Sequence, residues 1–117
     1  MNKAQQRERH LSKRFADLVK PVGFAVRIES SHTIPGFPDW QLFLESGKTA
    51  LVELKDYPNT VSIGQLAVHN RLRKLGHSVF VLTQYPASYV VLGHENRTCQ
   101  TLKEAVNYIL EQTYGTN

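Results

Sequence analysis

The segment GFPDWQLFLESGKTALVELK, residues 36–55, decides the expected fold of this chain. Its stretches 39–44 and 49–55 are largely apolar, and they flank a turn sequence at 45–48. Two such runs joined by a short turn that contains glycine are typical of a β-hairpin. The hairpin brings polar residues at the start of its first strand close to those at the end of its second strand.

The register of this hairpin follows from the position of its turn. With the turn centred near Gly47, antiparallel pairing predicts Asp39 opposite Lys55 and Gln41 opposite Glu53. Asp39 and Glu53 are then diagonal neighbours, about 8 Å apart at the backbone. Side chains alternate along a strand, so Glu53 and Lys55 share one face. A slip of one residue would turn the two acids away from each other.

The polar residues at the open end of the hairpin suggest a metal site. Two carboxylates held this close repel each other unless a positive charge lies between them. Mg²⁺ takes oxygen ligands from one or two carboxylates, which suggests Asp39, Glu53 and the backbone carbonyl of Leu54 as ligands. Lys55 would orient a water and stabilise negative charge on a phosphate. Each residue also has an ordinary interpretation, since Glu-x-Lys is common on surface strands and Asp after Pro is common in turns.

The rest of the chain predicts further helices and strands around the hairpin. Helices are expected over residues 2–20, 62–75 and 101–113, and strands over residues 24–29, 78–83 and 89–92. The helices have apolar residues at helical spacing, and the strands show alternation or a short apolar run. The order α-β-β-β-α-β-β-α predicts an α/β fold with a mixed sheet flanked by helices. The second helix would cross between strands that could be parallel.

Length and composition set the broad class. The 117 residues are enough for one modest core, so we expect a single domain over residues 1–117. The net charge of +4 weakly favours a polyanionic partner. The single cysteine, Cys99, excludes an internal disulfide and a cysteine-rich zinc site. No apolar segment resembles a signal peptide or a membrane span, so we expect a cytoplasmic location without membrane contact.

The hairpin motifs are part of a longer pattern along the chain. The pattern consists of Gly36-Phe37-Pro38-Asp39, Val52-Glu53-Leu54-Lys55, Ser62 with Gln65, and Leu72-x-x-Leu75-Gly76-His77-x-Val79-Phe80-Val81. Together these motifs resemble a VRR-NUC domain of the PD-(D/E)xK nuclease superfamily, over roughly residues 8–83. The resemblance implies a restriction-endonuclease-like fold, a Mg²⁺ or Mn²⁺ cofactor and no organic cofactor. It also implies a homodimer that cleaves branched DNA in a bacterial or phage-infected cell, as Holliday-junction resolvases do in DNA repair.

The resemblance also implies a role for individual residues. Asp39 and Glu53 match metal ligands, and Lys55 matches the catalytic lysine. Gln65 matches a helix glutamine that positions water or phosphate, although its place three residues after a serine is also that of a capping box. Glu8 matches the first-helix glutamate that completes the site, although a glutamate at the start of a surface helix needs no such role.

Basic residues outside the hairpin are candidate contacts to nucleic acid. We expect phosphate contacts from Arg27, His32, Arg71, Arg73 and Lys74, although solvated helix charge explains the last three equally well. The five histidines are dispersed and lack a paired ligand spacing, which argues against zinc.

Three functions remain open on these observations. The first is a Mg²⁺-dependent, structure-selective DNA endonuclease that hydrolyses phosphodiester bonds as a homodimer. The second is a non-catalytic nucleic-acid-binding module that keeps the nuclease fold, although such a module does not need acids facing a phosphate. The third is a small interaction protein whose charge is incidental.

Overall fold

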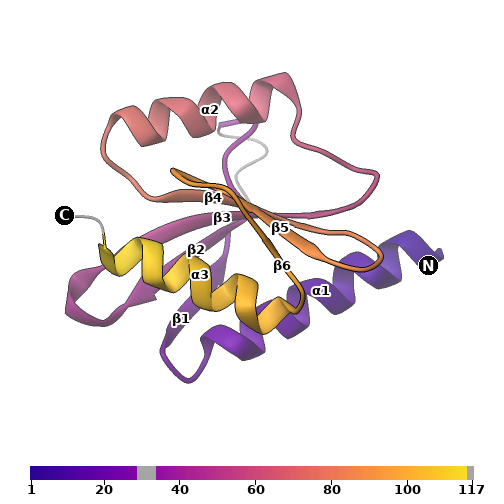
Figure 1. Cartoon of the computed structure of the whole chain (residues 1–117). Helices are drawn as coiled ribbons and strands as arrows, with labels where there is room; N and C mark the ends of the chain where they lie inside the picture. Colours follow the sequence, from indigo (N-terminus) through magenta and orange to yellow (C-terminus); the bar gives the residue numbers. More distant parts are fainter. Residues whose placement is uncertain (29–33, 116–117) are drawn as a thin grey trace.

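The computed structural model describes residues 1–28 and 34–115, which form one six-stranded sheet with three helices (Figure 1). The strands are β1 (Gly23–Arg27), β2 (Trp40–Leu44), β3 (Thr49–Asp56), β4 (Val79–Gln84), β5 (Tyr89–Leu92) and β6 (Arg97–Cys99). The helices are α1 (Lys3–Val19), α2 (Ile63–Lys74) and α3 (Leu102–Gly115). The strands follow chain order across the sheet; β3 and β4 are parallel, and all other neighbours are antiparallel. The predicted α/β class with a mixed sheet is confirmed.

The sequence prediction missed one strand, β6. This strand has three residues, of which only Cys99 is buried, and it pairs antiparallel with β5 at the edge of the sheet. Three residues are too few to show alternation, so the sequence alone does not mark them as a strand. The element order therefore contains one more strand than α-β-β-β-α-β-β-α.

The helices cover the two faces of the sheet unequally. Figure 1 shows α1 and α3 on one face and α2 on the other. The main core lies under α1 and α3, where Phe15 meets Trp40 edge to face with ring centroids 5.7 Å apart. Within α2 only His69 is buried, so the α2 face of the sheet has a thinner cover. No helix in the described part of the chain is both long and apolar enough to cross a membrane.

The hairpin forms as predicted, but its register differs from the expected one by two residues. Gln41 pairs with Leu51, not with Glu53. The cause is the turn, a short 3-10 helix at Glu45–Gly47 in which Ser46 has a φ of 61°. A shift by two residues keeps each side chain on its expected face. Continued beyond the start of β2, the observed register brings Asp39 beside Glu53 instead of beside Lys55.

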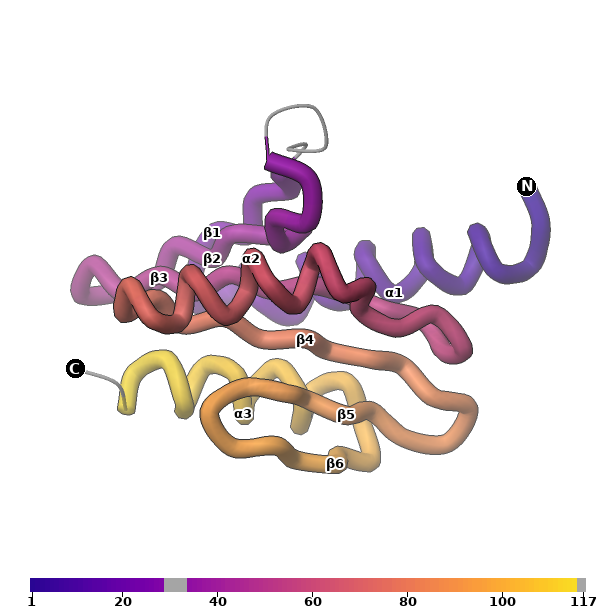
Figure 2. The backbone as a smooth tube through the Cα atoms, turned by 90° about the horizontal axis from the view of Figure 1, so that it is seen from above, coloured from indigo at the N-terminus to yellow at the C-terminus, as the bar shows by residue number. Residues whose placement is uncertain are grey.

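The helix α2 connects the two parallel strands at the centre of the sheet. It lies along β4, as Figure 2 shows. Its first turn is stabilised by the predicted capping box: Gln65 N–H donates to Ser62 Oγ (3.1 Å), and Ser62 N–H donates to Gln65 Oε1 (2.9 Å). The helix ends at Lys74 with Leu75 as its C-cap, and Gly76 follows with a φ of 97°, the left-handed conformation common after a helix C-terminus.

Candidate active site

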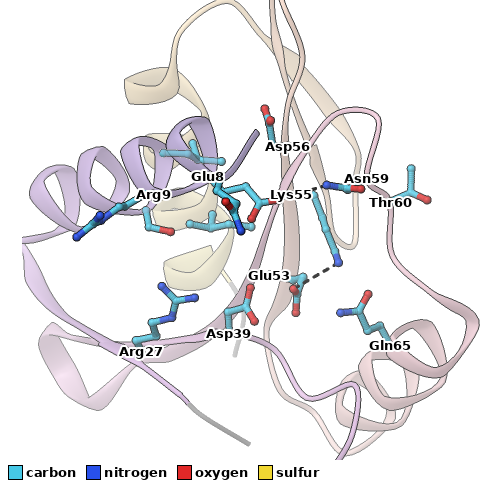
Figure 3. Close-up of a pocket in the computed structure, with 14 residues that line it drawn as sticks. Glu8, Arg9, Arg27, Asp39, Glu53, Lys55, Asp56, Asn59, Thr60 and Gln65 are labelled. Atoms are coloured by element: carbon cyan, nitrogen blue, oxygen red, sulfur yellow. Dashed lines mark hydrogen bonds and ion pairs between the residues drawn. The ribbon is translucent and has the colours of Figure 1, made fainter. Parts of the chain in front are cut away.

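A cavity of about 520 Å³ opens at the carboxyl end of the central strand β3, beside the first turn of α2. Its walls come from α1, β1, the residue before β2, the end of β3 and the first turn of α2 (Figure 3). The predicted residues that line it are Glu8, Arg27, Asp39, Glu53, Leu54, Lys55 and Gln65. Side chains from segments far apart in the sequence therefore meet in one cavity.

Asp39 is held in place by backbone contacts on both sides. Its carbonyl accepts a hydrogen bond from Ile28 N–H at 2.6 Å, which ties it to the end of β1. Three residues earlier, Gly36 has a φ of 90° and lies against the first turn of α2. A Cβ at Gly36 would stand 2.9 Å from the carbonyl oxygen of Gly64. The segment that carries Asp39 is thus packed between β1 and α2.

Glu53 is a buried acid of the cavity, and its pKa is strongly raised. Only 2% of the residue is exposed, although it carries a carboxyl group. Burial raises its pKa to about 8, and a hydrogen bond to the Asp39 side chain and the negative charge of Asp39 act in the same direction. The charge of Lys55 opposes this rise in pKa, since its Nζ lies 3.8 Å from Glu53 Oε2. The two acids are in contact, and their pair needs either a shared proton or a cation.

This pair of acids fits a divalent metal ion. A cation between the two carboxylates offsets their repulsion and the desolvation of the buried Glu53, and Mg²⁺ is bound in this way with its remaining positions filled by water. Leu54 lines the same cavity. Among residues 1–28 and 34–115, no group of three or more His, Cys, Asp and Glu side chains gathers around one point. Two carboxylates with water or carbonyl oxygens suit Mg²⁺ or Mn²⁺ better than zinc.

Glu8 reaches the cavity from the opposite wall. Its Oε1 accepts a hydrogen bond from Asn59 Nδ2 at 3.2 Å, which links α1 to the loop after β3. The sequence prediction did not include Asn59, because its contact with Glu8 joins residues 51 positions apart. Glu8 therefore lines the site and is held by the neutral side chain of Asn59. Among the described residues it does not join Asp39 and Glu53 in a group of three acids around one point.

Gln65 both forms the capping box of α2 and lines the cavity. Its oxygen and backbone N–H complete the capping box with Ser62, so it has a structural role in α2. The same side chain lines the cavity on the side of Glu53 and Lys55 (Figure 3). The amide nitrogen is left available to a ligand, because the capping box uses only the side-chain oxygen.

The proposed nucleic-acid contacts are divided between two regions. Arg27 lines the cavity, whereas Arg71, Arg73 and Lys74 lie in the last turn of α2. Gln65 and Lys74 are separated by roughly 13 Å along the helix axis. Arg73 also donates to the carbonyl of Val79, through Nη2 at 3.0 Å and Nε at 3.3 Å, which gives it a structural contact. His32 lies outside the described residues.

One residue near the site, His69, escaped the sequence prediction. It is fully buried, and its Nε2 lies 4.0 Å from Glu53 Oε1. Burial lowers the pKa of His69 to about 4, with the charges of Arg73 and Lys55 acting in the same direction. The available signal was its spacing, because His69 follows Gln65 by four residues and residues four apart share one face of a helix.

The comparisons with known proteins agree on the fold. Neither a protein-family model nor a curated protein sequence matches the chain. A solved structure described as a VRR_NUC domain is similar, with a TM-score of 0.65 and 23% identity, over 92% of this chain and 97% of that one. The structure of Archaeoglobus fulgidus Hjc, described as a Holliday junction resolvase from an archaeal hyperthermophile, is also similar. Its TM-score is 0.56 at 15% identity, over 86% of this chain and 98% of that one. The chain thus has the fold of the VRR_NUC domain and of Hjc, as its motifs indicated.

Proposed function

We propose that the protein is a Mg²⁺- or Mn²⁺-dependent endonuclease that hydrolyses phosphodiester bonds in DNA. The observation that carries this proposal is that the partly exposed Asp39 lies against the buried Glu53, next to Lys55, in a solvent-open cavity. A buried carboxylate with a second acid beside it is costly to keep in a fold, so such a pair in a cavity points to a bound cation and to chemistry.

In this proposal the role of each site residue follows from its position in the cavity. Asp39, Glu53 and the carbonyl of Leu54 would hold the metal. A bound divalent cation supplies positive charge that polarises a phosphoryl oxygen and lowers the pKa of a coordinated water. Lys55 Nζ stabilises the negative charge that grows on the phosphate in the transition state, and removing one such group typically costs about 10²- to 10³-fold in rate. Gln65 and Glu8 orient water or phosphate from the two walls of the cavity.

The proposed substrate is branched DNA, cut by a homodimer. The fold is shared with Hjc, which is described as a Holliday junction resolvase. The excess of 14 basic over 10 acidic residues favours a polyanion. A two-fold symmetric dimer would present two equivalent cavities to the two strands of a junction.

The test is cleavage of labelled DNA by the purified protein. Four-way junctions, flaps and linear duplexes are incubated with Mg²⁺, with Mn²⁺ or with EDTA, and light scattering measures the oligomeric state. We expect metal-dependent cleavage of branched DNA, loss of cleavage in Glu53→Gln, and normal cleavage in Glu45→Gln, which changes an exposed glutamate in the hairpin turn. Tight binding of DNA without cleavage under either metal would favour the non-catalytic binding module instead.

A further inference from the structure

His69 is buried against the sheet with no hydrogen-bond partner for its ring. The side chain has no exposed surface, and neither Nδ1 nor Nε2 has a partner within the described residues. Buried polar side chains are nearly always hydrogen-bonded, because an unpaired buried group costs roughly 1–3 kcal/mol. A leucine of similar size would fill this space between α2 and the sheet without that cost. The histidine therefore needs an explanation beyond packing.

The nearest polar atom to this ring is equally unsatisfied. Glu53 Oε1 is buried without a hydrogen-bond partner and lies 4.0 Å from His69 Nε2. At this distance the two atoms are about 1 Å too far apart for a hydrogen bond and too close for a bridging water. A movement of Oε1 by about 1 Å toward Nε2 would bring the two atoms to hydrogen-bond distance. An imidazole Nε2–H is a donor and an ionised carboxylate oxygen is an acceptor, so each atom supplies what the other lacks.

The second oxygen of Glu53, Oε2, already has neighbours of its own. Lys55 Nζ lies 3.8 Å from Oε2, and the side chain of Asp39 is hydrogen-bonded to the Glu53 carboxyl. A hydrogen bond donated to Oε1 would therefore fix the plane of the Glu53 carboxylate in one orientation. Metal-ligating carboxylates are commonly fixed by such an outer hydrogen bond, whose loss costs about 10- to 100-fold in metal affinity or activity.

We propose that His69 is a positioning residue: its Nε2–H donates to Glu53 Oε1 and fixes this carboxylate in the orientation that holds the divalent metal. The proposal rests on the proposed function, since it concerns the same metal site. His69 does not line the cavity, although its Nε2 lies 4.0 Å from Glu53 Oε1. It acts on the metal through Glu53 and not by contact with substrate.

The test uses Mn²⁺ alone, without DNA, as the probe. Calorimetric titration or electron paramagnetic resonance measures Mn²⁺ affinity of the wild-type protein, His69→Leu and His69→Gln, and melting in EDTA checks that each variant is folded. The glutamine amide nitrogen takes nearly the place of Nε2, so we expect His69→Gln to bind Mn²⁺ within a few-fold of wild type. We expect His69→Leu to lose about 10- to 100-fold in affinity. Equal Mn²⁺ affinity of His69→Leu and wild type would overturn the proposal, as would an equal loss in both variants.

A second measurement needs no variant of His69. Nitrogen-15 NMR of the wild-type histidine rings reports which nitrogen carries the proton, and we expect it on Nε2 of His69, with a resonance that shifts in Glu53→Gln. A proton on Nδ1 would overturn the proposal while leaving the endonuclease proposal intact. Absence of Mn²⁺ binding in the wild-type protein would instead overturn the proposed function, and the role of His69 with it.

Discussion

Replacing Glu53 with glutamine is expected to stabilise the metal-free protein at pH 8. The pKa of Glu53 rises from an ordinary value of 4.5 to about 8 in the fold, chiefly through burial. A carboxyl whose folded pKa is raised costs no stability below its unfolded pKa, and the cost grows as the pH rises toward the folded pKa. A shift of this size corresponds to roughly 5 kcal/mol as an upper limit. Glutamine removes the charge and keeps the shape.

The expected gain is smaller than this upper limit. Glutamine loses the attraction of Lys55, and its amide must find hydrogen bonds in a buried place. We expect Glu53→Gln to raise the free energy of unfolding by about 3 kcal/mol at pH 8, or roughly 10 °C in melting temperature. At pH 5 the difference should fall below about 1 kcal/mol, because glutamate is then largely protonated in the fold.

The assay is thermal and urea unfolding in EDTA between pH 5 and pH 8.5. Wild type, Glu53→Gln and the control Glu45→Gln are compared, and the other titrating groups cancel in the difference between variants. Cleavage activity should be lost in Glu53→Gln alone. If Glu53→Gln were no more stable than wild type at pH 8, or if its advantage were the same at pH 5, the argument that Glu53 carries a buried charge would be refuted.

Three further predictions concern the same site. At a hundredfold excess over the Kd, Mg²⁺ or Mn²⁺ should raise the free energy of unfolding of the wild type by about 2.7 kcal/mol, and therefore its melting temperature. Differential scanning fluorimetry should show no such gain in Glu53→Gln. Lys55→Met should cut DNA cleavage by at least about 100-fold while leaving the circular dichroism spectrum unchanged, and an active Lys55→Met would rule out its catalytic role. Gly36→Ala should lower the free energy of unfolding by about 1–3 kcal/mol and abolish most DNA cleavage. The reasons are the φ of 90° at Gly36 and the carbonyl oxygen of Gly64, which would lie 2.9 Å from the new Cβ. Gly76→Ala is its control, with a φ of 97° but no atom within 4 Å, and urea unfolding of both separates the effect of crowding at the site from backbone strain.

The sequence by itself determined the features that depend on short-range patterns. Alternation predicted the hairpin and placed Glu53 and Lys55 on one face, which the pairing of β2 with β3 and β3 with β4 confirms. The Ser62 and Gln65 spacing predicted the start of α2, where the capping box is found. These features follow from the geometry of a single strand or helix, so neighbouring residues carry the whole signal.

Only the tertiary structure decided how these pieces meet. The turn at Glu45–Gly47 shifted the hairpin by two residues and brought Asp39 level with Glu53, a detail of turn conformation that alternation does not encode. The contact of Glu8 with Asn59 and the approach of His69 to Glu53 join elements that are distant in the chain. Such contacts depend on how helices pack on a finished sheet, and that packing is a property of the whole core. Local propensity names the residues of a site, whereas packing sets the distances that determine its chemistry.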